Sequence, residues 1–166
     1  MLPRSRASTV VGVGVVLLVA LSIAFFAVDG LDTLAGEPTV VVTDTDGQEL
    51  VVAPIHDGDE VVLEYTHSVE RTLVRDVYVH EDGRLVMTRM EFSSFGAGLP
   101  SHAEVTIRDG RYVYHPPRSE YEPLRIMTGS TADHDLIVGE NRYDITALSG
   151  GGAVEVTIEN RFGWPS

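Results

Sequence analysis

The sequence predicts an all-β protein: an antiparallel β-sandwich or barrel of roughly 8–10 short strands, preceded by one transmembrane helix. Three observations lead to this prediction. Several segments alternate apolar and polar residues with a period of two, two Asp-Gly pairs separate such segments, and one long uncharged apolar stretch lies near the amino terminus. Beyond that stretch, no segment combines helical periodicity with helix-capping residues.

The amino-terminal stretch is expected to cross the lipid bilayer. No charged residue occurs in residues 7–28, and about 20 apolar residues at a rise of 1.5 Å each span its hydrocarbon core. Arg4 and Arg6 precede the stretch and Asp29 follows it. Because basic residues mark the cytoplasmic side, we expect a single-pass protein of the cell membrane with a cytoplasmic amino terminus.

This topology divides the chain into three parts. Residues 1–28 form the cytoplasmic terminus and signal anchor, residues 29–38 a tether, and residues 39–166 an extracytoplasmic β domain. The alternative is a signal peptide cleaved near Ala35. The apolar core of a signal peptide is usually only 7–15 residues long, which favours the anchor.

The β domain is expected to consist of strands separated by turn residues. The segment 86–92 is apolar on both faces, which indicates a strand inside a sheet. Asp82-Gly83 and Asp109-Gly110 each predict a two-residue hairpin, because a type I′ turn needs positive φ at both central residues. The β-rich segments that could supply these strands, in chain order, are Thr39–Thr43, Gln48–Ile55, Glu60–Val69, Asp76–Glu81, Arg84–Phe92, Ala103–Arg108, Arg111–Tyr114, Leu124–Thr128, Asp135–Val138, Tyr143–Leu148 and Val154–Glu159.

The charge and composition exclude several classes of function. The formal net charge is −13, and all 12 basic residues are Arg. A nucleic-acid-binding protein carries a basic surface, so no nucleic-acid partner is expected. The chain has no Cys, which excludes disulfides, thiolate metal sites and cysteine nucleophiles.

The acidic excess also predicts a high-salt environment, such as that of a halophilic archaeon. Excess charge of one sign destabilises a compact protein through self-repulsion. At about 1 M salt the Debye length falls to about 3 Å, and most of that repulsion disappears.

Two blocks differ from the alternating pattern and resemble a known family. His67-Ser68-Val69-Glu70 is followed, after a strand, by Gly96-Ala97-Gly98-Leu99-Pro100. With this order and spacing, about residues 39–140 resemble domain-of-unknown-function family 1850. Members of that family tend to be encoded beside TRAP-type transporters of the TAXI class, which import organic anions. The resemblance therefore implies TRAP permease or solute-binding subunits as partners, and it implies no activity.

Several residues in and around these blocks are candidates for a ligand or partner surface. They are His67, Ser68, Glu70, Arg75, Glu91, Gly96, Gly98 and Pro100. The loop around Gly96 and Gly98 is either a tight turn or a nest of N–H groups that cradles a carboxylate. Arg71, Arg75 and Arg89 are the other groups that could hold an anion.

His67 has three possible roles. On an extended strand it shares a face with Tyr65, while Ser68 and Glu70 lie on the other. It is then a partly buried residue bonded to a backbone carbonyl, or a pH-sensitive ligand for an anion or metal beside Glu70, Asp76 or Glu91. A Ser68–His67 catalytic pair is disfavoured, because neighbours on a strand point to opposite faces.

The leading hypothesis is a membrane-anchored, non-enzymatic accessory or binding factor of an organic-anion transporter. One alternative is an exported hydrolase or metal-dependent enzyme built around His67, Glu70 and Glu91, and another is a structural protein of the cell surface. The six His show no metal-binding spacing, so no cofactor is predicted and a metal site stays undefined.

Overall fold

The computed structural model describes residues 36–94 and 104–162. The expected membrane-spanning residues 7–28 lie outside these ranges. The chain divides into two units, and the unit Glu37–Arg161 contains every strand that the structure describes. Within the described ranges, no helix has both the length and the apolar character needed to cross a membrane.

The all-β fold class is confirmed. The described residues form twelve strands, more than the eight to ten expected, and every strand pair is antiparallel. The strands are β1 (Glu37–Asp44), β2 (Glu49–Pro54), β3 (Glu60–Thr66), β4 (Leu73–Glu81), β5 (Arg84–Phe92), β6 (Val105–Arg108), β7 (Arg111–Tyr114), β8 (Ser119–Tyr121), β9 (Leu124–Met127), β10 (Asp135–Val138), β11 (Asn141–Asp144) and β12 (Ala153–Arg161).

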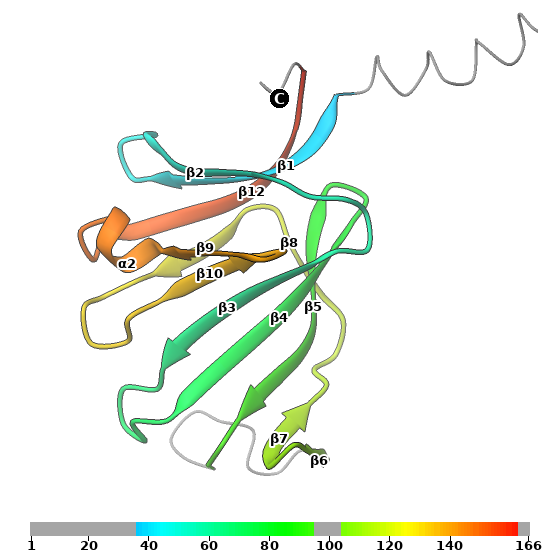
Figure 1. The fold of residues 1–166 in the computed structure, drawn as a ribbon, viewed down its shortest axis with the longest axis vertical. Coiled ribbons are helices and arrows are strands. Elements are labelled where there is room, and N and C mark those ends of the chain that lie inside the picture. Colours follow the sequence, from blue (N-terminus) through cyan, green and yellow to red (C-terminus); the bar gives the residue numbers. More distant parts are fainter. Residues whose placement is uncertain (1–35, 95–103, 163–166) are drawn as a thin grey trace, which may run out of the picture. The chain divides into compact units, whose positions relative to one another are not determined.

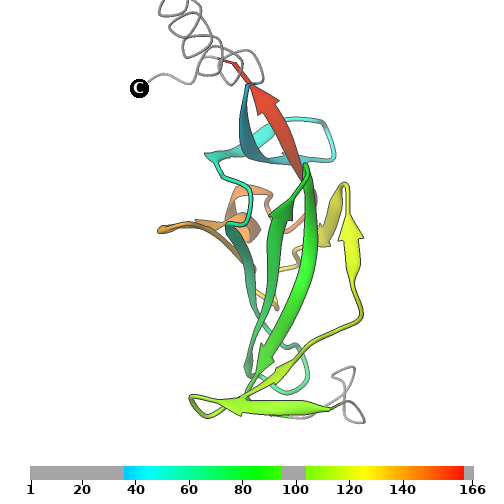
Figure 2. The ribbon, with the colours of Figure 1, turned by 90° about the vertical axis from the view of Figure 1, so that its right-hand side faces the viewer.

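The strands form two sheets, which Figures 1 and 2 show from two directions. One has four strands in the order β2-β1-β12-β9. The other has eight, in the order β11-β10-β3-β4-β5-β7-β6, with β8 paired to β5. Strand β5 lies inside this sheet, as predicted, but it is not apolar on both faces, because Arg89 and Glu91 occupy one of them. The β6–β7 hairpin pairs with the last residues of β5 and lies at that end of the long strands (Figure 2).

Both sheets contribute to one hydrophobic core. Burying a Val, Leu or Ile side chain stabilises a fold by about 1.5–3 kcal/mol, so this shared cluster holds the sheets together. Its buried members are Val40, Val42, Val51, Ala53, Ile55, Val61, Leu63, Tyr78, Leu85, Leu124, Ile126, Leu136, Val138, Ile145, Val154 and Val156. A smaller cluster around Val74 and Phe92 packs beside the β6–β7 hairpin.

Both predicted hairpin turns are confirmed. Asp82 and Gly83 have φ values of 49° and 77° between β4 and β5, and Asp109 and Gly110 have 49° and 78° between β6 and β7. Positive φ at both central residues is the type I′ geometry that matches the twist of the flanking strands.

The expected strand Asp76–Glu81 begins earlier, at Leu73, and β8 was not expected. Two other expected strands end earlier than predicted. The segment Glu60–Val69 ends as a strand at Thr66, because the chain turns through residues 67–72, where Arg71 has a φ of 56°. The segment Tyr143–Leu148 is a strand only to Asp144, and Ile145–Leu148 is the short helix α2. Asp144 caps that helix by accepting the amide of Ala147 at 2.7 Å, which outweighs the strand preference of its β-branched residues.

Candidate functional site

A line of alternating charges crosses one face of the eight-stranded sheet. Glu64 on β3 lies opposite Arg75 on β4, which lies opposite Glu91 on β5. Arg75 Nε is 3.3 Å from Glu64 Oε2, and Arg75 Nη1 is 3.4 Å from Glu91 Oε2. Arg142 extends the line with a contact of 2.7 Å to Glu64. Strand register therefore brings together charges that are far apart in the sequence.

Glu91 is the point where three arginines converge. Its carboxylate lies 2.9 Å from Arg89 Nε, 3.4 Å from Arg75 Nη1 and 3.5 Å from Arg111 Nη1, and its side chain is only 14% exposed. Burial alone would raise the pKa of this carboxyl. The guanidinium groups, led by the hydrogen bond from Arg89, overcome that effect and hold the pKa of Glu91 below its usual range.

Arg89 binds two carboxylates at once. Its Nη1 and Nη2 donate to Glu60 at 2.6 and 3.1 Å, while its Nε donates to Glu91 at 2.9 Å. The hydrogen bonds to Glu60 are the largest cause of a raised Arg89 pKa. All three nitrogens of Arg89 are therefore engaged by the protein itself.

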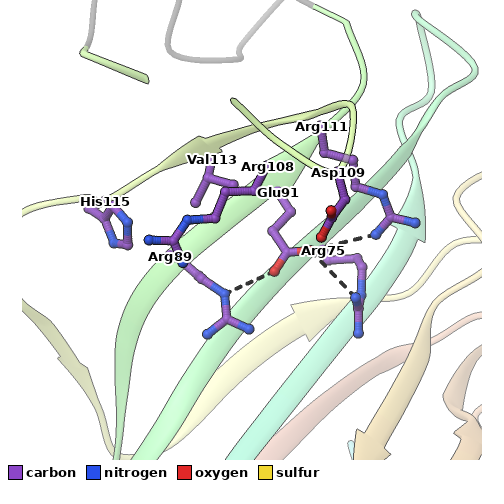
Figure 3. A pocket seen from close by; sticks show the side chains of 8 residues that line it. All are labelled: Arg75, Arg89, Glu91, Arg108, Asp109, Arg111, Val113 and His115. Carbon is purple, nitrogen blue, oxygen red and sulfur yellow. Dashed lines mark hydrogen bonds and ion pairs between the residues drawn. The ribbon is translucent and has the colours of Figure 1, made fainter. Parts of the chain in front are cut away.

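These arginines line a cavity of about 690 Å³, the arginine pocket (Figure 3). Its walls contain four Arg and two acidic residues, in a chain whose net charge is −13. The volume lies within the range of small-molecule binding sites. The lining residues are Arg75, Arg89, Glu91, Arg108, Asp109, Arg111, Val113 and His115.

The β6–β7 hairpin brings a second group of charges to the pocket. Arg108 and Arg111 flank the Asp109-Gly110 turn and are directly paired across the two strands. Like charges in this position destabilise a strand pair. Arg111 makes a long contact to Glu91, whereas Arg108 has no ion pair with any residue in the described ranges.

Most described arginines form an ion pair with an acidic side chain, and Arg108 does not. With Arg71 it is one of two described arginines that form no ion pair with an acidic side chain of the described residues. The paired ones are Arg75, Arg84, Arg89, Arg111, Arg118, Arg125, Arg142 and Arg161. Most other described arginines are therefore neutralised by acidic side chains. Arg108 is not, so its guanidinium group can bind an anion in the pocket.

His115 supplies a titratable group at one side of the pocket. Its Nδ1 lies 3.0 Å from the carbonyl oxygen of Thr88. A carbonyl oxygen only accepts hydrogen bonds, so Nδ1 carries the proton. The other ring nitrogen, Nε2, can then donate to an anion when the ring is protonated.

The arginine pocket suits recognition of negative charge. Guanidinium groups form bidentate, charge-assisted hydrogen bonds with carboxylates and phosphates. None of the eight lining residues carries a hydroxyl, thiol or amine nucleophile. In the part of the chain that the structure describes, no group of three or more His, Asp or Glu is arranged to hold a metal ion.

The described candidate residues predicted from the sequence lie in two separate places. Arg75 and Glu91 meet in the arginine pocket. His67, Ser68 and Glu70 lie in the turn between β3 and β4, and His67 Nδ1 accepts the Glu70 amide at 3.1 Å.

The predicted face-sharing of His67 along a strand is therefore wrong, because the strand ends at Thr66. The ring bonds a backbone amide rather than the expected carbonyl. Gly96, Gly98 and Pro100 lie outside the described residues.

Asp76 does not join His67 either. It is 8% exposed, and the Tyr65 hydroxyl donates to its Oδ2 at 3.4 Å. Its Oδ1 is buried and has no hydrogen-bond partner in the described ranges. Burial raises the pKa of Asp76 to about 6. Since Asp76 follows Arg75 on β4, it points to the opposite face of the sheet from the arginine pocket.

Four residues of the pocket were not among the candidates predicted from the sequence: Arg108, Asp109, Arg111 and His115. A signal for the first three was present, because a two-residue hairpin places the residues that flank its turn opposite each other. Arg108 and Arg111 flank the predicted turn at Asp109-Gly110 and could have been paired from the sequence.

The comparisons with known proteins agree with the family resemblance of the two sequence blocks. Residues 61–145 match the family model described as Domain of unknown function (DUF1850). The chain belongs to this family. The matched range runs from β3 to the start of α2 and contains all eight residues of the arginine pocket. No curated protein and no solved structure matches the chain.

In this DUF1850 chain, strands β1, β2 and β12 lie outside the matched range. They provide three of the four strands of the smaller sheet, which contributes to the shared core. The arginine pocket belongs entirely to the part that defines the family.

Proposed function

We propose that this DUF1850 chain is a membrane-anchored, non-enzymatic binding protein that holds a small organic anion outside the cell. It serves as an accessory factor of a TRAP-type transporter of the TAXI class. The observation that supports this proposal is the arginine pocket, where four guanidinium groups gather on a strongly acidic protein.

The charge distribution favours a bound anion over a purely structural role for these arginines. The net charge of −13 repels anions from most of the surface. Specific contacts are needed to overcome that repulsion, and Arg108 offers a guanidinium that no described acidic residue neutralises. A cavity of about 690 Å³ accommodates a small molecule rather than a macromolecule.

Membrane attachment and the transporter partner rest on the sequence. Residues 7–28 carry no charge and follow two arginines, which favours a span with the β domain outside. Family members tend to be encoded beside transporters that import organic anions. A protein that binds an organic anion at the outer surface of the membrane matches the needs of such a transporter.

The described contacts favour neither of the other two functions. A hydrolase or metal-dependent enzyme needs His67 to converge with Glu70 and Glu91. In the described ranges the His67 ring bonds only a backbone amide, and Glu91 is engaged by arginines. A purely structural surface protein gives no reason for a cationic pocket.

Two experiments test the proposal on the full chain in molar salt. Thermal unfolding with added carboxylates tests binding, because a ligand that binds the native state raises Tm. We expect organic carboxylates to raise Tm and neutral amides of the same size to leave it unchanged. A Tm that no carboxylate moves would contradict the binding function.

Crosslinking in native membranes tests the partner. The tagged protein is captured and its companions are identified by mass spectrometry. We expect permease or solute-binding subunits in stoichiometric amounts, and recovery of the protein alone would contradict the transporter association.

A further inference from the structure

The hydrogen-bond donors of the arginine pocket that the protein leaves unused identify where a ligand binds. Arg89 uses all three of its nitrogens on Glu60 and Glu91. Arg75 donates Nη1 to Glu91 at 3.4 Å. Its buried Nε lies 3.3 Å from Glu64 without a hydrogen bond, and within the described residues its Nη2 makes no ion pair or hydrogen bond. Within the described residues, Arg111 uses only Nη1, at 3.5 Å from Glu91, and Arg108 uses none.

These unused donors fall into two groups. In the view of Figure 3, Arg108 lies on the same side of Glu91 as His115, and Arg75 and Arg111 lie on the other side. The carboxylates of Glu91 and Asp109 stand between the two groups (Figure 3). A single compact anion placed between the groups would face these two negative charges. An anionic group at each end would face arginine and avoid them.

We infer that the arginine pocket binds a dicarboxylate, with one carboxylate at Arg108 and His115 and the other at Arg111 and Arg75. This inference rests on the proposed anion-binding function and specifies its ligand class. Glu91 and Arg89 are positioning residues. Glu91 pairs with Arg75, Arg89 and Arg111, and Arg89 donates all three of its nitrogens to Glu60 and Glu91, so neither residue has a polar group left for the ligand.

The like-charged pair on the hairpin is an independent reason for this assignment. Arg108 and Arg111 face each other across β6 and β7, where a pair of opposite charges would stabilise the strands. The chain has 25 acidic residues and places none of them opposite either arginine at this position. The two side chains diverge to opposite sides of Glu91, so a ligand with a carboxylate at each end can contact both (Figure 3).

Isothermal titration of the full chain in molar salt tests the inference. The probes are the straight-chain dicarboxylates malonate, succinate, glutarate and adipate, each compared with the monocarboxylate of equal chain length. We expect at least one dicarboxylate to bind about ten-fold or more tightly than its monocarboxylate, because each charge-assisted contact contributes at least that factor. Equal affinities would overturn the dicarboxylate assignment and leave the proposed function standing. Binding of neither class would contradict the proposed function itself.

Variants then separate binding residues from positioning residues. Arg108→Ala and Arg111→Ala are each expected to reduce the affinity for the best dicarboxylate to the level of its monocarboxylate. The Tm of Arg108→Ala stays unchanged or rises, because Arg108 has no ion pair within the described residues, and Arg111→Ala loses only a long contact to Glu91. Arg125→Ala is the matched control, since Arg125 pairs with Glu155 on the other sheet. Full dicarboxylate preference in both pocket variants would overturn the assignment, and so would loss of that preference in the control.

Discussion

Arg108 and Arg111 are paired across the β6–β7 hairpin, and their guanidinium groups lie on opposite sides of Glu91 (Figure 3). The same chain surrounds most of its other described arginines with carboxylates. The two paired positions carry like charges, and a ligand that is anionic at both ends would contact both side chains at the pocket.

Reversing one charge of this pair is expected to stabilise the fold and abolish binding. Arg108→Glu replaces a repulsive cross-strand pair with an attractive one, a gain of about 0.5 kcal/mol and about 2 °C in Tm. The control is Arg125→Glu, which places Glu opposite Glu155 and should lower Tm. A lower Tm for Arg108→Glu in thermal unfolding would refute the claim that the pair is repulsive.

Glu91 is expected to be the most sensitive residue of the pocket. Glu91→Gln removes the negative charge that three guanidinium groups share, and losing these partly buried ion pairs costs about 1–3 kcal/mol, between the values for exposed and buried pairs. Because the pKa of Glu91 is lowered in the folded state, its stabilising contribution is present above the unfolded pKa and is lost as the pH falls through the folded value. Urea unfolding with pH series of both proteins measures the loss. If the variant is as stable as wild type at pH 7, the ion pairs of Glu91 with the three arginines contribute nothing to the free energy of unfolding.

Asp76 is expected to produce a pH dependence of the opposite sign. Its folded pKa of about 6 exceeds the unfolded value of about 3.9. Between those values the native state keeps a proton that the unfolded state has released, so the free energy of unfolding falls as the pH rises from about 4 to 6.

Asp76→Asn removes this charge and keeps an acceptor for the Tyr65 hydroxyl. We expect the variant to be more stable than wild type at pH 7 by on the order of 2 kcal/mol and equally stable near pH 4. Denaturant unfolding at each pH measures the difference, and parallel curves for the two proteins would disprove the assignment.

The stability of the whole chain is expected to increase with salt. Screening weakens the self-repulsion of a chain with a net charge of −13, and it also weakens the exposed ion pairs. Exposed pairs contribute only about 0–1 kcal/mol each, so relief of the repulsion dominates. Thermal unfolding from low to molar potassium chloride tests this, and a constant or falling Tm would argue against adaptation to high salt.

Local patterns predicted much of the fold because their causes are local. Asp82-Gly83 and Asp109-Gly110 adopt type I′ turns since both central residues tolerate positive φ. The end of β3 at Thr66 was not predicted. The turn that follows it places Arg71 at a φ of 56°, a conformation that is uncommon for arginine and cannot be expected from the sequence. The helix at Ile145–Leu148 was missed because an Asp144 cap competes with β-branched residues that favour a strand.

The arginine pocket depends on pairings that the sequence does not specify. Arg75 and Glu91 were both candidates, yet their contact follows from the register of β4 on β5. The β6–β7 hairpin reaches them only because β7 pairs with the last residues of β5. Local alternation identifies each strand and carries no information about which strand lies beside it.

Titration of the best-binding dicarboxylate into wild type, Arg108→Ala and the Arg125→Ala control tests the central claim most directly. With an anion held in the arginine pocket, wild type and the Arg125→Ala control bind equally, and Arg108→Ala loses about ten-fold or more in affinity. Equal affinity in all three proteins would contradict the account, because binding would then occur elsewhere on the chain.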